Sequence, residues 1–554
     1  MPHPTLVDMF FEQADAQPDR AALFCKAADV FHGTSWSRLA TEVQRVAAGL
    51  VAWGVQPGDR VLQLSENRYE WVILDLAIQT ACAVHVPVHS PLAAEQVAYQ
   101  IEDSQPRVIV VSTAEQAEKV ERCGDCLSVG QHVFSFDPCT AKTNGESVRA
   151  WQELSHNVGR EAEEGARLQA SQRLGPDSLA TILYTSGTTG EPKGVMLTQQ
   201  NLVSNTLATL AAIGHDQSDL RLNFLPLSHI FARTCDLYTW IAAGAQLALA
   251  ESRDTVLADC ATLKPTVLNA VPFFYDKVQR VLTEHGRADE QGVLQEVFGG
   301  RIRLCCSGGA ALADHVFDFY QQRGLPILQG YGLSETSPVI TVSTPTHARR
   351  GSAGRAVPGV EISIADDGEI LTRGPHVMAG YYRNPAATDE MIRAGWLYTG
   401  DLGHLDDDGF LFITGRKKEI LVTSGGKNVA PVFLESLLTE DPLILQALVV
   451  GDDRNYLAAL IVPDLDALRG AISESEIQVP PVPQALEHPK IVSWYEERIR
   501  QRLQRVSYYE QVRKFTLLDR GFTIEKGELT PKMSLRRKII EKNFRPQIEA
   551  MYEK

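Results

Sequence analysis

The sequence predicts an α/β protein. We expect a large N-terminal domain of stacked α/β subdomains, a small β-barrel-like subdomain, and a smaller α+β C-terminal domain. Three observations favour this. The 554 residues are more than one hydrophobic core normally serves. Short Val/Ile/Leu-rich runs alternate with helical patterns over the first several hundred residues. From about Gly351, short alternating runs separated by Asp-Gly pairs replace that pattern.

The apolar runs of the first part are bounded like buried strands. Short strands separated by helices predict parallel sheets with crossover helices. The number of runs predicts more than one sheet. The stretch 72–88 reads as a buried helix that runs into a strand, because Asp75, Gln79 and His85 interrupt it. The expected strands are Arg60–Leu64, 108–112, 180–184, 221–225, Val267–Ala270 and 303–306.

The second part of the chain carries hairpin signals. Asp367-Gly368 and Asp408-Gly409 stand between alternating runs, which predicts an antiparallel or barrel-like subdomain over about 345–415. A new unit then begins, with two adjacent strands (ALVVGD and LAALIVPD) and a charged helix over 491–508. We therefore expect an N-terminal domain of residues 1–416 and a C-terminal domain of residues 417–554.

Composition excludes several classes of protein. The net charge of −16 disfavours nucleic-acid binding, which depends on phosphate attraction. The N-terminus lacks a signal-peptide pattern, and no run of about 18 apolar residues predicts a membrane span. Nine irregularly spaced cysteines indicate reduced thiols in a cytoplasmic protein. The pair Cys123 and Cys126 is more easily explained as two loop cysteines than as a redox or metal site.

A glycine- and hydroxyl-rich loop follows the apolar run 180–184. Glycines allow backbone N–H groups to approach a ligand, and the hydroxyls and a lysine add donors, which suits a polyphosphate. The spacing is not that of a Walker loop. The alternative, a flexible surface loop, leaves this density of donors unexplained. The candidate binding residues are Thr185, Ser186, Gly187, Thr188, Thr189, Gly190 and Lys193.

Six further segments follow in order: LPLSHIFAR (225–233), SGGAAL (307–312), QGYGLSET (329–336), WLYTGD (396–401), GRKKEILVTSGGKNVAP (415–431) and GELTPKMSLRRK (527–538). Together with the first loop, they resemble the adenylate-forming superfamily of acyl-CoA synthetases, luciferases and adenylation domains. The resemblance extends over almost the whole chain. The sequence of residues 225–233 is similar to that of long-chain fatty acid–CoA ligases in particular.

The resemblance implies roles for the nucleotide site. Tyr331 would stack on adenine, Thr336 would contact the α-phosphate and Glu335 would help to hold Mg²⁺. A carboxylate suits this hard cation, which typically bridges substrate phosphates. Small residues after the run 303–306 would let adenine approach, although close helix–strand packing explains them equally well. The other expected nucleotide contacts are Gly308, Gly309, Ala310, Gln329, Gly330 and Gly332.

The resemblance also assigns the domain boundary and the CoA path. Asp401 would accept hydrogen bonds from both ribose hydroxyls, with Arg416 as a second ribose contact. Lys418 would be the hinge about which a mobile C-terminal domain rotates. A glycine-rich turn would line the pantetheine tunnel, although a plain αβ connection also explains its glycines. The turn residues are Ser424, Gly425 and Gly426.

Two assignments concern the acyl substrate and the adenylation lysine. His229 and Phe231 are candidates for the acyl site, although a lone histidine is more often structural. Related ligases carry a lysine where this chain has Ser534, so Lys532 is the candidate lysine here, with Arg536 as its competitor. The basic run 536–538 could instead be a solvated helix face or a contact to the CoA phosphates.

The expected activity is that of an ATP-dependent long-chain fatty acid–CoA ligase, with ATP, Mg²⁺ and coenzyme A as cofactor, metal and co-substrate. Two alternatives stay open: a ligase for another acid or acceptor, such as an acyl carrier protein, and a non-catalytic homologue. A homodimer and peripheral contact with the inner face of a membrane are also left open. The candidate catalytic residues are Lys532, Thr336, Glu335, Lys193 and His229.

Overall fold

The computed structural model describes residues 5–127, 130–143, 145–156, 158–185, 192–425, 427–475, 477–504, 506–523, 525–529 and 535–553. The chain divides into two compact units. The first unit comprises residues 1–309, 319–363 and 371–398. The second comprises residues 310–318, 364–370 and 399–554.

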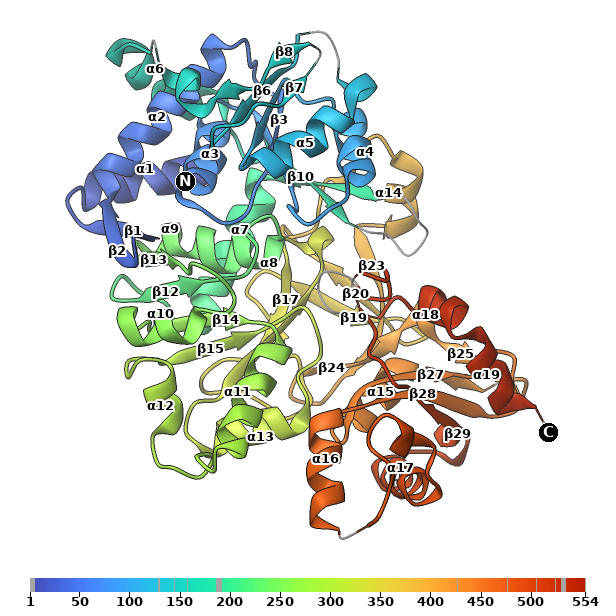
Figure 1. Ribbon diagram of the computed structural model, residues 1–554. Helices are drawn as coiled ribbons and strands as arrows, with labels where there is room; N and C mark the ends of the chain where they lie inside the picture. Colours follow the sequence, from blue (N-terminus) through green and yellow to red (C-terminus); the bar gives the residue numbers. More distant parts are fainter. Residues whose placement is uncertain are drawn as a thin grey trace. The chain divides into compact units, whose positions relative to one another are not determined.

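The first unit contains two large mixed sheets (Figure 1). The nine-stranded sheet is parallel from β16 to β1, with antiparallel strands at its two edges. Its order is β18 (Arg355–Ala356), β17 (Val339–Val342), β16 (Ile327–Gly332), β15 (Leu304–Ser307), β14 (Val267–Ala270), β12 (Leu220–Asn223), β13 (Gln246–Leu249), β1 (Ala21–Ala27) and β2 (Val30–Ser35).

The eight-stranded sheet is parallel from β10 to β9, and its first three strands are antiparallel. Its order is β21 (Gly380–Tyr381), β11 (Lys193–Thr198), β10 (Leu179–Thr185), β4 (Val84–Val88), β3 (Arg60–Leu64), β5 (Val108–Val111), β6 (His132–Ser135) and β9 (Arg149–Ala150). A separate two-stranded sheet pairs β7 (Lys142–Thr143) with β8 (Glu146–Ser147).

Helices cover both faces of the eight-stranded sheet, as the alternation of side chains along its strands requires. On β3, Val61 packs in the cluster formed with α1, α2 and α3, whereas Leu62 and Leu64 pack in the cluster formed with α4 and α5. Figure 1 shows these two groups of helices on opposite sides of the strands. The helices are α1 (Leu6–Ala16), α2 (Trp36–Ala52), α3 (Tyr69–Thr80), α4 (Ala94–Ser104), α5 (Ala114–Arg122) and α6 (Arg160–Arg173).

Helices also connect the strands of the nine-stranded sheet. A π-helix, Arg233–Tyr238, interrupts the segment between α8 and α9. These helices are α7 (Gln199–Ile213), α8 (Ile230–Ala232), α9 (Thr239–Ala243), α10 (Val256–Leu263), α11 (Pro272–Glu284), α12 (Val293–Val297) and α13 (Asp314–Gln322). A further helix, α14 (Pro385–Met391), follows β21 of the eight-stranded sheet.

The segment with Asp-Gly pairs folds as antiparallel hairpins. Gly368 and Gly409 both have positive φ, 84° and 79°, as these turns demand. The strands are β19 (Glu361–Ile364), β20 (Glu369–Arg373), β22 (Ile392–Arg393), β23 (Trp396–Leu405) and β24 (Leu411–Arg416). The long strand β23 is antiparallel to β22 and to β24.

The rest of the second unit is an α+β arrangement. Its three-stranded sheet pairs β27 (Ile444–Val450) antiparallel with β28 (Leu457–Pro463), which lies parallel to β29 (Val512–Leu517). A hairpin joins β25 (Leu421–Val422) and β26 (Asn428–Val429). The helices are α15 (Pro431–Thr439), α16 (Leu465–Glu474), α17 (Pro489–Arg502), α18 (Arg537–Asn543) and α19 (Arg545–Tyr552).

The predicted fold class is confirmed. Four of the expected strands differ from their predicted bounds by one or two residues, and one helix is several residues shorter than expected. The helix expected over 491–508 spans Pro489–Arg502, and Ser507 and Glu510 form the capping box of a separate 3₁₀ turn, Tyr508–Glu510. All nine cysteines are free thiols. None of the described helices combines the length and apolar character that a membrane crossing needs.

Candidate active site

The predicted phosphate loop follows β10 and precedes β11, and these two strands are antiparallel. Their register places Thr185 opposite Lys193 and Tyr184 opposite Gly194. Gly194 permits the close packing there, since a Cβ would lie 2.8 Å from the Ile182 side chain. The loop residues Ser186, Gly187, Thr188, Thr189 and Gly190 lie outside the described residues.

Lys193 and Glu335 meet the same aromatic ring. The Lys193 Nζ lies 5.0 Å from the centroid of the Tyr381 ring, and the Tyr381 hydroxyl donates a 2.8 Å hydrogen bond to Glu335 Oε1. Burial and the Glu335 charge raise the pKa of Tyr381 well above its ordinary value, so the phenol stays protonated. Tyr381 is the residue of this cluster that the sequence patterns did not single out.

The surroundings of Glu335 fit a magnesium ion that is shared with substrate phosphates. Among the described residues, no cluster of three or more His, Cys, Asp or Glu side chains could hold a metal by itself. Mg²⁺ is commonly held by one or two carboxylates together with phosphates and water. Glu335 is half-buried, and Oε2 receives no hydrogen bond from the part of the chain that is described.

The turn that carries Glu335 is set by Gly332 and Thr336. A Cβ on Gly332 would lie 1.6 Å from the Pro338 carbonyl oxygen, so only glycine fits. The buried Thr336 hydroxyl donates to the Pro338 carbonyl at 2.6 Å and accepts from the Leu333 N–H at 2.9 Å. Thr336 therefore closes the turn, and its expected contact with the α-phosphate stays a prediction.

The expected adenine-binding segments lie at the carboxyl ends of adjacent parallel strands. Ser307 at the end of β15 is paired with Gln329 on β16, so the segments that follow both strands start at the same sheet edge. Gly330, Tyr331 and Gly332 continue β16. Ligands of α/β sheets typically bind at such edges.

The glycines after β15 also serve packing. A Cβ on Gly308 would lie 3.1 Å from the Phe231 ring, which supports the close-packing explanation of this glycine. Gly309 has φ +82°, a conformation that favours glycine. Ala310 belongs to the second compact unit.

Hydrogen bonds hold the segment 225–233 at several points. Asn67 donates to the Leu225 carbonyl at 2.7 Å and accepts from the Leu227 N–H at 2.8 Å. His229 Nδ1 accepts a 3.2 Å hydrogen bond from the Phe231 N–H and caps α8. His229 thus has a structural contact, and its expected acyl contact stays a prediction.

A buried ionic network lies at the start of the π-helix. Arg233 pairs with Asp75 and donates to Thr181 Oγ1 at 2.8 Å, while His85 Nδ1 lies 2.7 Å from Asp75 Oδ1. Burial and the Arg233 charge lower the pKa of His85 to about 4, so this imidazole is neutral at pH 7. The network ties β4 and β10 to the segment that carries Phe231. The sequence feature that could have revealed this network is the presence of polar residues within the apolar stretch 72–88.

In the second unit, Asp401 and Arg416 are cross-strand partners on β23 and β24. Arg416 Nε lies 2.8 Å from Asp401 Oδ1, with Asp401 buried and Arg416 exposed. Lys417 instead pairs with Asp367 and Glu369. The next residue, Lys418, is exposed in a 3₁₀ turn.

The expected pantetheine turn connects β25 and β26. Ser424 donates to Asn455 Oδ1 at 2.6 Å, and its N–H donates to the Arg454 carbonyl at 3.0 Å. Gly425 is exposed, and a Cβ there would meet only Thr423 Oγ1, at 3.9 Å. Gly426 lies outside the described residues.

Lys532 lies outside the described residues, but the two ends of its segment are well anchored. Leu529 and Leu535 form an antiparallel bridge, which makes Lys532 the central residue of the five between them. Before the bridge, buried Glu528 accepts two 2.8 Å hydrogen bonds from Arg520 and one of 2.9 Å from Asn543.

After the bridge, Arg537 is anchored by a second buried pair. Arg537 Nη1 lies 2.7 Å from Glu435 Oε1, and the pair is only 10% and 8% exposed. Within the basic run 536–538, Arg537 is therefore structural, whereas Arg536 and Lys538 are exposed.

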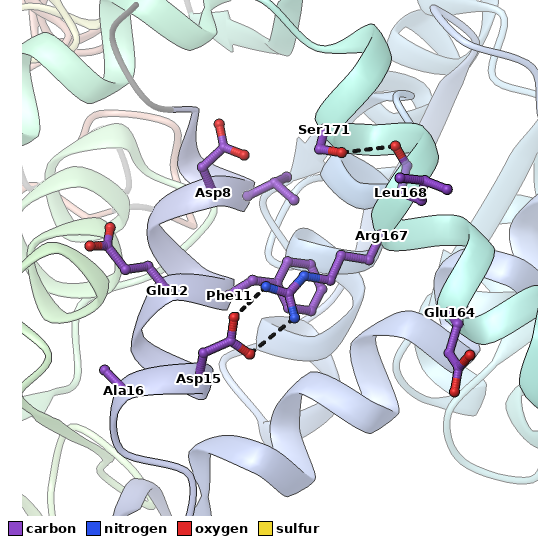
Figure 2. Close-up of a pocket in the computed structure, with 10 residues that line it drawn as sticks. Asp8, Phe11, Glu12, Asp15, Ala16, Glu164, Arg167, Leu168 and Ser171 are labelled. Carbon is purple, nitrogen blue, oxygen red and sulfur yellow. Dashed lines mark hydrogen bonds and ion pairs between the residues drawn. The ribbon is translucent and has the colours of Figure 1, made fainter. Parts of the chain in front are cut away.

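A pocket elsewhere in the first unit lacks the chemistry of the expected site (Figure 2). It lies between α1 and α6 and contains none of the predicted site residues. Its acidic lining residues are Asp8, Glu12, Asp15 and Glu164, and its one cation, Arg167, is paired with Asp15 and stacked 4.7 Å from the Phe11 ring centroid. An anionic nucleotide or carboxylate would be repelled there.

Comparison with known proteins gives a consistent result. Residues 10–382 match the AMP-binding enzyme model, and residues 418–554 match the AMP-binding enzyme C-terminal domain. The chain is 36% identical to the long-chain-fatty-acid–CoA ligase FadD15 of Mycobacterium bovis, covering 100% of this chain and 98% of that protein.

Solved structures show the same fold. The anthranilate CoA ligase AuaEII in complex with anthranoyl-AMP matches with a TM-score of 0.81 at 20% identity, covering 99% of both chains. ATP-bound MatB from Rhodopseudomonas palustris matches with a TM-score of 0.76 at 25% identity, covering 98% of this chain and 99% of that one. The chain therefore belongs to the AMP-binding enzyme family.

Proposed function

We propose that this chain is an ATP-dependent long-chain fatty acid–CoA ligase. The fatty carboxylate attacks the α-phosphorus of ATP, and the bond to the bridging oxygen of pyrophosphate breaks. The CoA thiol then attacks the carbonyl carbon of the acyl-adenylate, loses its proton, and AMP leaves. Positioning and charge stabilisation account for catalysis, so no side-chain nucleophile is needed.

The observation that carries this proposal is the cluster of Lys193, Tyr381 and Glu335 at the ends of the phosphate loop and the β16 turn. In it an ammonium group and a carboxylate both contact the Tyr381 ring, which supports a phosphate role for Lys193 and a magnesium role for Glu335. Mg²⁺ held there would neutralise charge on the departing pyrophosphate. The full-length similarity to FadD15 supports the fatty acid and CoA as substrates.

The remaining roles are proposals that follow from the family pattern. Asp401 and Arg416 bind the ribose, and Lys532 bridges the carboxylate and the α-phosphate. Residues 417–554 form a domain that rotates about Lys418 between the two half-reactions, with Ser424, Gly425 and Gly426 along the pantetheine path. A homodimer, a cytoplasmic location and peripheral membrane contact stay predictions from the sequence.

A substrate screen tests the proposal. The purified chain is incubated with ATP, Mg²⁺, CoA and acids from short to very long, and AMP and acyl-CoA are measured together. We expect acyl-CoA and AMP in equal amounts, with long-chain acids preferred. Adenylate that is released by an acyl carrier protein but not by CoA would assign a different acceptor. Pyrophosphate release that is independent of any acid would contradict the proposal.

A further inference from the structure

Tyr381 contacts two groups of opposite charge, Lys193 and Glu335, for which we have proposed roles in nucleotide binding. β11 and β21 are antiparallel with Val195 opposite Tyr381. Because side chains alternate along a strand, Lys193 lies on the same face as Val195. The Tyr381 ring consequently lies under the Lys193 ammonium, 5.0 Å from Nζ to the ring centroid.

The hydroxyl end of the same ring holds Glu335. It donates to Oε1 at 2.8 Å, and the Met378 N–H donates to the Glu335 carbonyl oxygen at 2.9 Å. The segment 378–381 thus holds both the backbone and the side chain of Glu335. One carboxylate oxygen is engaged, and the other is left for a cation.

The backbone around Tyr381 is held in place by close packing and a hydrogen bond. Gly380 has φ +140°, and a Cβ there would lie 2.8 Å from Thr388 Cγ2. The Tyr381 N–H donates to Thr388 Oγ1 at 2.9 Å. With only 6% of the residue exposed, the ring has little freedom to move.

The separation of the two charges has a functional consequence. In the described part of the chain, Lys193 and Glu335 form no ion pair with each other. An ion pair between them would engage the cation needed by the phosphates and the anion needed by the metal. A ring with a negative face and a polar edge can satisfy both groups without joining them.

We propose that Tyr381 is a positioning residue that keeps Lys193 and Glu335 apart and orients Glu335 toward the metal ion bound with ATP. The inference rests on the proposed metal role of Glu335. Tyr381→Phe removes only the hydrogen bond and keeps the ring beneath Lys193. Its effect should therefore fall on metal-dependent binding and leave metal-free nucleotide binding unchanged.

The experiment measures equilibrium binding without turnover. The probe is α,β-methylene-ATP, which cannot be cleaved at the reacting bond, with and without Mn²⁺, followed by calorimetry and by the EPR signal of free Mn²⁺. Tyr381→Phe should weaken Mn²⁺-dependent binding about three- to tenfold, the size of a typical net hydrogen-bond contribution, because the bond that orients Glu335 is lost. Tyr382→Phe, the neighbour on the opposite strand face, should bind like the wild type. Thermal unfolding checks that both variants are folded.

A double-mutant cycle separates this inference from the function that it assumes. Glu335→Gln should weaken Mn²⁺-dependent binding, and adding Tyr381→Phe should cause no further loss. Wild-type binding by Glu335→Gln would remove the metal assignment itself. Loss in Glu335→Gln without loss in Tyr381→Phe, or losses that multiply in the double variant, would overturn the positioning role of Tyr381 alone.

Discussion

The Asp401 carboxylate and the Arg416 guanidinium are paired across neighbouring strands, with Asp401 Oδ1 2.8 Å from Arg416 Nε. The pair joins a buried acceptor to an exposed donor. This arrangement holds the carboxylate in one orientation, which a vicinal diol requires for two simultaneous hydrogen bonds.

Asp401→Ala should chiefly raise the KM for ATP. Loss of hydrogen bonds to a charged acceptor costs about 1.5–3 kcal/mol, or roughly ten- to a hundredfold in KM. Lys417→Gln is the matched control, since Lys417 pairs with Asp367 and Glu369, in and just after the turn between β19 and β20. Steady-state kinetics at varied ATP concentration give the KM for ATP of each variant. An unchanged KM in Asp401→Ala would mean that the ribose is held elsewhere.

Two arginine ion pairs should differ sharply in their effect on stability. Arg233 and Asp75 are both fully buried, so Arg233→Met leaves an unpaired charge in the core and should cost about 3–5 kcal/mol. Arg167 pairs with Asp15 at the surface (Figure 2), so Arg167→Met should cost about 1 kcal/mol or less. Urea unfolding at pH 7 measures both variants, and equal losses would contradict the argument from burial.

The Glu528 anchor predicts a specific acid sensitivity. Hydrogen bonds from Arg520 lower the pKa of Glu528 to about 2 despite its burial. A carboxyl whose folded pKa is depressed stabilises the fold above its unfolded pKa of about 4.3, and this contribution is lost as the pH falls toward about 2.

Glu528→Gln should therefore lower the free energy of unfolding of the second unit by about 1–3 kcal/mol at pH 7. It should also flatten the loss of stability between about pH 5 and pH 2 by roughly the same amount. Glu549→Gln is the control, because its partner Arg454 is 38% exposed and the pair is screened. Unfolding curves at a series of pH values give the free energy of unfolding of each variant as a function of pH. Parallel pH profiles for wild type and Glu528→Gln would contradict this prediction.

The adenylation lysine is tested by separating the two half-reactions. Lys532 is central between the bridged residues Leu529 and Leu535, whereas Arg536 lies outside that bridge with its N–H bonded to the Glu528 carbonyl. Lys532→Ala should abolish adenylate formation, while thioester formation from supplied acyl-AMP largely survives. Arg536→Ala should adenylate normally. The reverse result would assign the role to Arg536.

Much of the fold follows from local pattern. The bounds of β3 and β14 were predicted residue for residue, because each is a short apolar run between breakers. The strand before the predicted phosphate loop, β10, covers the expected apolar run 180–184. These features depend on neighbours in the sequence, where pattern carries information.

The missed features depend on long-range contacts. Tyr381 meets Glu335 across 46 residues, and Arg233 meets Asp75 across 158. The sequence around Tyr381 does not indicate that this residue contacts Glu335. The sequence around Arg233 likewise does not indicate that it pairs with Asp75. Only the order of the strands in the two sheets brings each pair together, and that order is not written in any short segment.

The central claim is that the fatty carboxylate attacks the α-phosphorus of ATP. The direct measurement uses a fatty acid with ¹⁸O in both carboxyl oxygens, together with ATP, Mg²⁺ and CoA, and mass spectrometry of the products. The account predicts one ¹⁸O in the phosphate of AMP and one in the thioester carbonyl. Unlabelled AMP, or ¹⁸O in pyrophosphate or inorganic phosphate, would contradict it.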